Sequence, residues 1–121
     1  MTTQVLIVDD MANVRQDLHT LLDLCAEIEI VGEAVNGQEA IQQVEALKPD
    51  VVLLDLEMPE LDGYAAARQI KVHNPLTRII ALTVYGSQEV IQRAFQEGVD
   101  SFVVKGTPYD ELIQTILEGK E

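Results

Sequence analysis

The stretch VVLLDLEMPELDG, residues 51–63, joins an apolar run to an acidic loop. Its first four residues, Val51 to Leu54, are all aliphatic, which is typical of a strand buried on both faces of a parallel sheet. The run then ends on the carboxylate of Asp55, and both a proline and a glycine follow before residue 64. A buried strand that ends on an acid indicates a functional group held in place by a rigid element.

The rest of the chain repeats this alternation of apolar runs and amphipathic segments. Further strands are predicted at Val5–Val8, Ile79–Leu82 and Phe102–Val104, with a weaker one at Ile28–Val31 leading to Ala34–Val35. Between the runs, apolar residues recur every three or four positions, as in a helix. These sets are Val14, Leu18, Leu21, Leu22 and Cys25; Ala40, Ile41, Val44 and Leu47; Tyr64, Ala67 and Ile70; Val90, Ile91, Ala94 and Phe95; and Leu112, Ile113, Ile116 and Leu117. Five strands alternating with five helices predict a single α/β domain over residues 1–121, with parallel strands, right-handed crossovers and helices on both faces of the sheet.

Composition excludes several classes of function. The chain has 121 residues, with 21 acidic and 8 basic side chains, and its formal charge is −13. Such a charge repels nucleic acid and anionic lipid, so we expect no direct binding to DNA or membranes. The single cysteine, Cys25, cannot form an intramolecular disulfide and is expected in the core. No export leader is recognisable and no apolar run approaches the roughly 18 residues of a membrane span, which favours a cytoplasmic protein.

Polar residues follow the ends of four predicted strands. Asp9 and Asp10 follow the first strand, Asp55 the third, Thr83 the fourth and Lys105 the fifth. Because the carboxyl ends of parallel strands meet at one edge, where ligands of open α/β sheets bind, we expect these side chains to converge.

This combination of groups points to phosphoryl transfer. Three close carboxylates repel one another unless a cation neutralises them, and Mg²⁺ prefers carboxylates, water and a phosphate oxygen. The ammonium of Lys105 and the hydroxyl of Thr83 can bind the remaining phosphoryl oxygens. Aspartate is an established nucleophile towards phosphorus, so Asp55 is the candidate for forming an aspartyl phosphate.

Four motifs make the chain similar to the response-regulator receiver domains of bacterial two-component systems. They are VLIVDD at 5–10, LLDLEMPELDG at 53–63, ALT at 81–83 and the lysine that follows SFVV. The segment from residue 82 to 116 most resembles the NarL/LuxR-type subgroup. The resemblance implies a doubly wound, CheY-like and flavodoxin-like sheet in the order 2-1-3-4-5, covering essentially the whole chain with no second domain.

The resemblance also assigns roles to individual residues. Asp55 would be the phosphoacceptor of a histidine kinase, and Asp10 and Asp55 would bind Mg²⁺ directly. Asp9 would act mainly through a water, and the backbone carbonyl of Glu57 would complete the protein ligands, leaving the Glu57 side chain free to vary.

A conformational switch and an output follow from the same resemblance. Thr83 and Phe102 match the pair in which the hydroxyl moves towards the phosphoryl group and the aromatic ring follows. Phosphorylation would favour a homodimer and control transcription through a DNA-binding domain absent from these residues. The chain would be no enzyme beyond self-catalysed phosphotransfer and autodephosphorylation.

Other interpretations remain open at this point. The chain could be a stand-alone receiver or phosphorelay protein, a small Mg²⁺-dependent aspartyl-phosphate phosphatase, a flavin module of the same fold, or a degenerate receiver. Asp10 could simply cap the first helix. Met58-Pro59 and Asp62-Gly63 are read as turn geometry, and His19 and His73 as surface residues without a phosphate or metal role.

Overall fold

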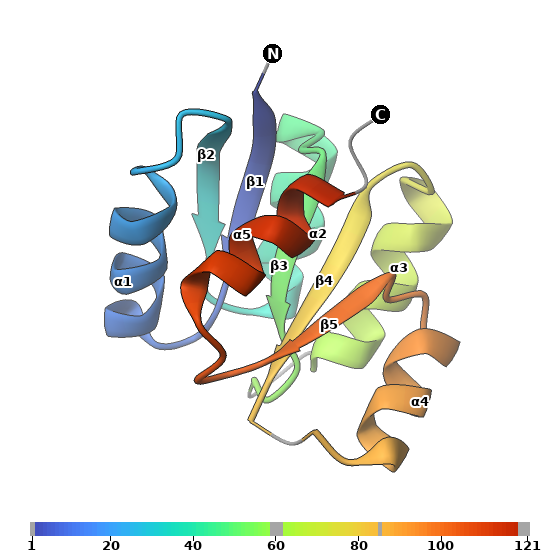
Figure 1. Ribbon diagram of the computed structural model, residues 1–121. Coiled ribbons are helices and arrows are strands. Elements are labelled where there is room, and N and C mark those ends of the chain that lie inside the picture. The colour runs from blue at the N-terminus through green and yellow to red at the C-terminus, as the bar shows by residue number, and fades with distance from the viewer. Residues whose placement is uncertain (1, 59–61, 85, 119–121) are drawn as a thin grey trace.

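The structure, a computed structural model, describes residues 2–58, 62–84 and 86–118, and strands and helices alternate throughout (Figure 1). The elements are β1 (Thr3–Val8), α1 (Ala12–Leu22), β2 (Ile28–Ala34), α2 (Gly37–Leu47), β3 (Val51–Asp55), α3 (Gly63–His73), β4 (Arg78–Thr83), α4 (Gln88–Gln96), β5 (Ser101–Val104) and α5 (Tyr109–Glu118). Each predicted strand and helix is present, with ends shifted by a few residues. No helix of the described residues has the length and apolar composition required to cross a bilayer.

The five strands form one parallel sheet in the order β2-β1-β3-β4-β5, which confirms the predicted fold. The first strand, β1, lies inside the sheet, where it pairs with β2 on one side and with β3 on the other. All carboxyl ends therefore lie along one edge, the lower edge of Figure 1. The tips of β1, β3 and β4 are neighbours there, which is what brings distant segments of sequence to one site.

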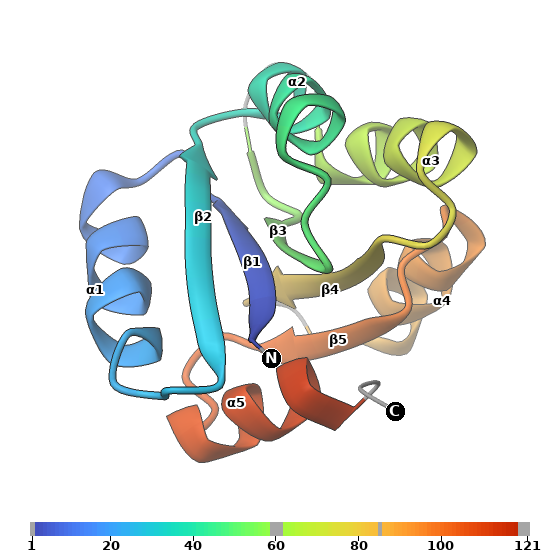
Figure 2. The ribbon, with the colours of Figure 1, turned by 90° about the horizontal axis from the view of Figure 1, so that it is seen from above.

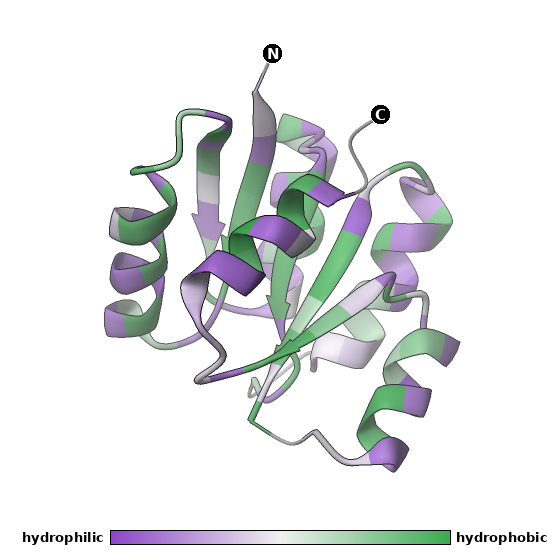
Figure 3. Ribbon diagram, viewed as in Figure 1, coloured by the Kyte–Doolittle hydropathy of each residue, from purple (hydrophilic) through white to green (hydrophobic). Residues whose placement is uncertain are grey.

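Helices cover both faces of the sheet, and the view from above shows the two layers (Figure 2). Helices α1 and α5 pack on one face over a buried cluster that includes Leu22, Leu53 and Ile116. Helices α2, α3 and α4 pack on the other over a cluster that includes Val44, Leu54 and Ala94. Since both faces are covered, the strands are apolar along most of their length, whereas the helices carry polar residues as well (Figure 3).

The start of α3 is packed tightly against the tip of β3. A Cβ atom on Gly63 would lie 2.6 Å from the backbone oxygen of Asp55 and 2.7 Å from the Cα of Leu56, so only glycine fits at this position. The Asp62 side chain accepts a hydrogen bond from the N–H of Ala65 and caps the helix. The Asp62-Gly63 pair, predicted to form a turn, is instead the start of a helix, with Asp62 as the N-cap and Gly63 as the first residue of α3, whereas Pro59 of the other predicted turn lies outside the described residues.

The first helix differs from the sequence prediction at both ends. It ends at Leu22, and Cys25 lies in the following turn, half-buried and packed against the α1–α5 side of the core. The spacing of apolar residues that is typical of a helix continues to Cys25, although the helix itself ends at Leu22. At the other end the N-cap is Met11, whose backbone N–H donates to Asp9 Oδ1 at 2.9 Å. Asp10 therefore does not cap this helix, which leaves its carboxylate available to the site.

Candidate functional site

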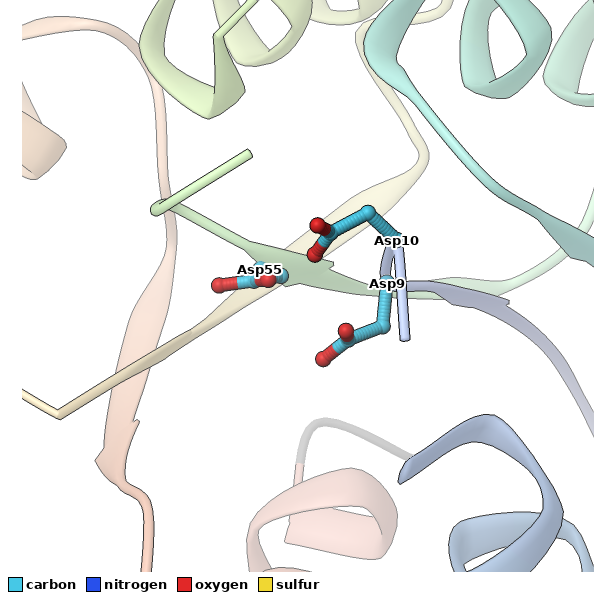
Figure 4. A group of neighbouring side chains, drawn as sticks. All are labelled: Asp9, Asp10 and Asp55. Atoms are coloured by element: carbon cyan, nitrogen blue, oxygen red, sulfur yellow. The ribbon is translucent and has the colours of Figure 1, made fainter. Parts of the chain in front are cut away.

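Three carboxylates meet at the tips of two adjacent strands (Figure 4). Asp9 and Asp10 follow β1 directly, and Asp55 is the last residue of β3. Because Val8 pairs with Leu54 in the sheet, the residues that come next are held side by side. One oxygen from each of the three carboxylates lies within 4.8 Å of the others. The predicted convergence of these acids is confirmed.

Lys105 reaches the same cluster from beyond the edge strand. Its Nζ lies 3.3 Å from Asp9 Oδ2 and 3.3 Å from Asp55 Oδ1. The backbone N–H of Lys105 donates to the carbonyl of Thr83 at 2.8 Å, which extends the β4–β5 pairing to this residue. Gly106 then turns the chain towards α5 with a φ of +96°, a left-handed conformation that glycine adopts without strain. The predicted position of the ammonium opposite the acids is confirmed.

Burial raises the pKa of the Asp55 carboxyl from 3.8 to about 6. The backbone N–H of Glu57 donates to Asp55 Oδ1 at 3.0 Å and opposes the increase, while the charge of Asp9 adds to it. Burial also works against the ammonium of Lys105, but the charges of Asp55 and Asp9 outweigh it and raise its pKa. The site therefore favours a positive charge beside the Asp55 carboxylate, which burial makes costly to ionise.

The donor set fits a hard divalent cation. Asp9 and Asp55 are buried, with 0% and 1% of their surface exposed, whereas Asp10 is exposed at the mouth of the cluster. Carboxylate oxygens are the ligands that Mg²⁺ prefers, and an open side leaves room for the waters it retains. Asp9, Asp10 and Asp55 together form a pocket that could bind a metal. The role of the Glu57 backbone carbonyl as a further ligand stays a prediction.

Thr83 is bound to a side chain that the sequence analysis left without a role. Its hydroxyl donates to Glu57 Oε2 at 2.8 Å, and the backbone N–H of Val84 donates to Glu57 Oε1 at 3.1 Å. Asp55 pairs with Leu82, so the residues that follow the tips of β3 and β4 face each other. The register that brings the Glu57 side chain to the end of β4 is a feature of the structure that the apolar runs of the sequence do not indicate.

Phe102 lies on the same face of the sheet as Thr83. It pairs with Ala81 on β4, and Thr83 follows Ala81 by two positions, so the three side chains point to the same side. Phe102 is half-buried against the α2–α3–α4 side of the core and meets Phe95 of α4 edge to face, with ring centroids 6.2 Å apart. An aromatic ring on the Thr83 face of the sheet is what the switch prediction requires, and the switch role of Thr83 and Phe102 stays a prediction.

Arg15 is a further residue of the site that the sequence analysis missed. Its Nη1 donates to the backbone carbonyl of Asp9 at 2.8 Å, and its Nε donates to Glu33 Oε1 on β2 at 3.0 Å. Hydrogen bonds from His19 and Arg15 hold the pKa of Glu33 below its usual value despite partial burial. His19 remains partly exposed and pairs with Glu33 and Asp23, outside the acidic cluster. Arg15 thus connects α1 to the loop that carries the two N-terminal acids.

Comparisons with known proteins agree with this geometry. The family model described as response regulator receiver domain matches residues 5–117. The response regulator protein VraR of Staphylococcus aureus is 38% identical over 116 residues, which is 96% of this chain and 56% of VraR. The chain therefore spans about half the length of this curated relative.

Two solved structures illustrate the fold likeness. A DNA-binding response regulator of the LuxR family from Staphylococcus aureus has a TM-score of 0.87 and 30% identity, covering 96% of this chain and 97% of that one. CheY of Borrelia burgdorferi, solved with CheX, BeF3 and Mg²⁺, has a TM-score of 0.88 and 25% identity, covering 95% and 87%. This chain belongs to the family of response regulator receiver domains of two-component systems, in its NarL/LuxR-type subgroup.

Proposed function

We propose that Asp55 accepts a phosphoryl group from the phosphohistidine of a histidine kinase. The observation that carries the proposal is the surroundings of the Asp55 carboxylate. It is buried at a strand tip, 3.3 Å from the ammonium of Lys105, and is grouped with the carboxylates of Asp9 and Asp10. A rigid nucleophile beside a fixed cation is the arrangement that phosphoryl transfer needs, because positioning and charge neutralisation supply most of the catalysis.

The transfer replaces one bond to phosphorus with another. A carboxylate oxygen of Asp55 attacks phosphorus, and the P–N bond to the kinase imidazole breaks as the new P–O bond forms. The electron pair of the broken bond stays on the imidazole nitrogen, which takes up a proton. Lys105 stays beside the carboxylate and neutralises charge on the transferred group, and the Thr83 hydroxyl donates to one of its oxygens.

Mg²⁺ is the cofactor that this donor set fits, and Asp9, Asp10 and Asp55 would hold it, with the Glu57 carbonyl as a further ligand. When bound, it neutralises the acids and the phosphoryl oxygens together. The Borrelia CheY complex contains Mg²⁺ and BeF3, a chemical stand-in for a phosphoryl group, which supports this assignment.

The output is control of transcription through a DNA-binding domain, with the aspartyl phosphate acting as a signal and autodephosphorylation as its decay. Movement of Thr83 and Phe102 would carry the change to the α4 and β5 surface, where phosphorylation favours a homodimer. The LuxR-family relative is a DNA-binding regulator, and VraR extends well beyond the matched region. A formal charge of −13 makes this domain itself a poor DNA ligand. Phosphotransfer from a histidine kinase would take place in the cytoplasm, which is the location we propose for the domain.

Incubation with phosphoramidate, with and without Mg²⁺, tests the proposal. Intact mass spectrometry should detect one added phosphoryl group, dependent on Mg²⁺ and lost in Asp55→Asn. Steady turnover of phosphate esters would instead indicate a phosphatase. A folded protein that takes up no phosphoryl group would indicate a degenerate receiver.

A further inference from the structure

The carboxylate of Glu57 is bound to the end of β4. One oxygen accepts the hydroxyl proton of Thr83 at 2.8 Å, and the other accepts the backbone N–H of Val84 at 3.1 Å. Thr83 is buried, with 1% of its surface exposed, whereas Glu57 is exposed to solvent. The contact therefore joins a fixed donor to an acceptor that is able to leave.

These donors lie at the end of β4, beside the strand tip that carries Asp55. Asp55 pairs with Leu82, so its side chain lies at the level of the β4 tip, just before Thr83. The backbone N–H of Glu57 donates to Asp55 Oδ1 at 3.0 Å, which holds the two residues in one tight turn. A hydroxyl and an N–H each carry one proton, so a hydrogen bond given to Glu57 is not given at the same time to a phosphoryl oxygen.

We propose that the Glu57 side chain is an internal competitor of the phosphoryl group. Its two oxygens hold the Thr83 hydroxyl and the Val84 N–H while Asp55 is unmodified, and phosphorylation displaces them. The exchange replaces one anionic acceptor with another, so the bonds to Glu57 subtract from the stability of the phosphorylated state. This inference rests on the proposed role of Asp55. It adds that phosphorylation has to break the two hydrogen bonds to Glu57, which costs free energy.

A second anion beside the phosphoryl group strengthens the effect. The phosphoryl group brings additional negative charge next to the acids, and the Glu57 carboxylate would repel it at such short range. Because Glu57 is exposed, its carboxylate can turn into water without leaving a buried charge behind. Displacement is thus possible at moderate cost, which suits a residue that tunes activation without preventing it.

Titration with beryllofluoride in the presence of Mg²⁺ measures the competition directly, followed by the amide resonances in ¹⁵N-labelled protein. The Glu57→Gln variant keeps the shape but loses the charge and should bind beryllofluoride about tenfold more tightly, the order of a charge-assisted hydrogen bond. Glu27→Gln removes the same charge from the opposite edge of the sheet, where the Glu27 carbonyl binds the N–H of Thr3, and should behave as wild type. Equal affinities of wild type and Glu57→Gln would overturn the inference.

The Thr83 hydroxyl supplies a coupling test that a merely structural role would not pass. In Thr83→Ala the hydroxyl donor is absent, so the gain in beryllofluoride affinity caused by Glu57→Gln should be smaller. Thr83→Ser keeps a hydroxyl and should restore this gain. A gain of equal size in all three backgrounds would refute the exchange at this hydroxyl. Wild-type protein that binds no beryllofluoride and takes up no phosphoryl group would instead refute the role of Asp55, so the two failures are distinguishable.

Discussion

The ammonium of Lys105 lies 3.3 Å from a carboxylate oxygen of Asp55, although Asp55 ends β3 and Lys105 follows β5, two strands that do not pair with each other. The same ammonium lies 3.3 Å from Asp9, so a single cation joins the acids of β1 and β3. Lys105 therefore partly neutralises the cluster through its ion pairs with two of the three acids. A divalent ion held by the same acids would have to compete with this ammonium for their oxygens.

Replacing Lys105 with methionine should tighten Mg²⁺ binding while slowing phosphorylation. The side chain keeps its apolar length but frees the oxygens of Asp9 and Asp55, so we expect roughly three- to tenfold higher affinity by calorimetry, the order of a partly buried ion pair. Phosphorylation by phosphoramidate should fall, since the transferred group loses its counter-charge. Lys48→Met, an exposed lysine paired with Glu45 outside the site, is the matched control. Weaker Mg²⁺ binding in Lys105→Met would contradict the competition.

The raised pKa of Asp55 makes folding stability depend on pH. Folding raises the pKa of the Asp55 carboxyl from 3.8 to about 6. The stability that protonated Asp55 contributes is therefore fully present below pH 3.8 and is lost as the pH rises through 6. Asp55→Asn has no such loss. In EDTA, we expect the variant to exceed wild type by about 2 to 3 kcal/mol at pH 7.5 and by little near pH 4.

Urea unfolding at both pH values, followed by circular dichroism, checks this expectation. Asp110→Asn, an exposed acid in the first turn of α5, should show no comparable gain at pH 7.5. An Asp55→Asn protein that is less stable than wild type at pH 7.5 would show that hydrogen bonds and the ion pair with Lys105 outweigh burial.

The acids and the lysine of the site could be predicted from sequence because their positions follow from simple rules. An apolar run identifies each strand, and parallel strands end at one edge, so the residue after each run is placed without knowledge of any side-chain conformation. Asp9, Asp55 and Lys105 are of this kind. Their convergence depends only on strand order, which the resemblance supplied.

The contacts that were missed depend on finer detail. Glu57 meets Thr83 because the register of β3 against β4 aligns their tips, and register is not readable from apolar runs alone. Arg15 reaches the Asp9 carbonyl through one particular conformation of a long side chain. Cys25 was assigned to the first helix because it continues the helical period, but the backbone turns after Leu22, with the N–H of Cys25 bound to the Leu22 carbonyl.

Substitution of Gly63 by alanine should disturb the fold and the site together. The new Cβ would lie 2.6 Å from the Asp55 backbone oxygen, and backbone atoms of a central strand cannot move aside cheaply. We expect about 1 to 3 kcal/mol lower stability by urea unfolding and slower phosphorylation by phosphoramidate. In the control Gly32→Ala, the nearest atom, at 2.9 Å, is the end of the Leu47 side chain, which can shift, so the loss should be smaller. Equal losses in both variants would argue against a special packing of α3 on β3.

Removal of the Arg15 guanidinium should weaken metal binding without touching any acid of the cluster. Arg15→Met keeps the apolar stem but loses the bonds to the Asp9 carbonyl and to Glu33, so the loop carrying Asp9 and Asp10 gains freedom. We expect Mg²⁺ affinity to fall several-fold and stability to fall by about 1 to 2 kcal/mol. Arg68→Met, in which an exposed arginine loses its pair with Glu97, is the control for charge and should leave Mg²⁺ affinity unchanged.

A variant of Glu33, the partner of Arg15, distinguishes the positioning role of the guanidinium from the effect of its charge. Glu33→Gln retains an oxygen that can accept from Arg15 while removing the negative charge, so it should weaken Mg²⁺ binding less than Arg15→Met does. If Arg15→Met instead bound Mg²⁺ more tightly, the guanidinium would act on the site through its positive charge and not by holding the loop. The order of the three affinities, measured by calorimetry at low and at high ionic strength, decides between these roles because long-range charge effects are screened by salt and a direct hydrogen bond is not.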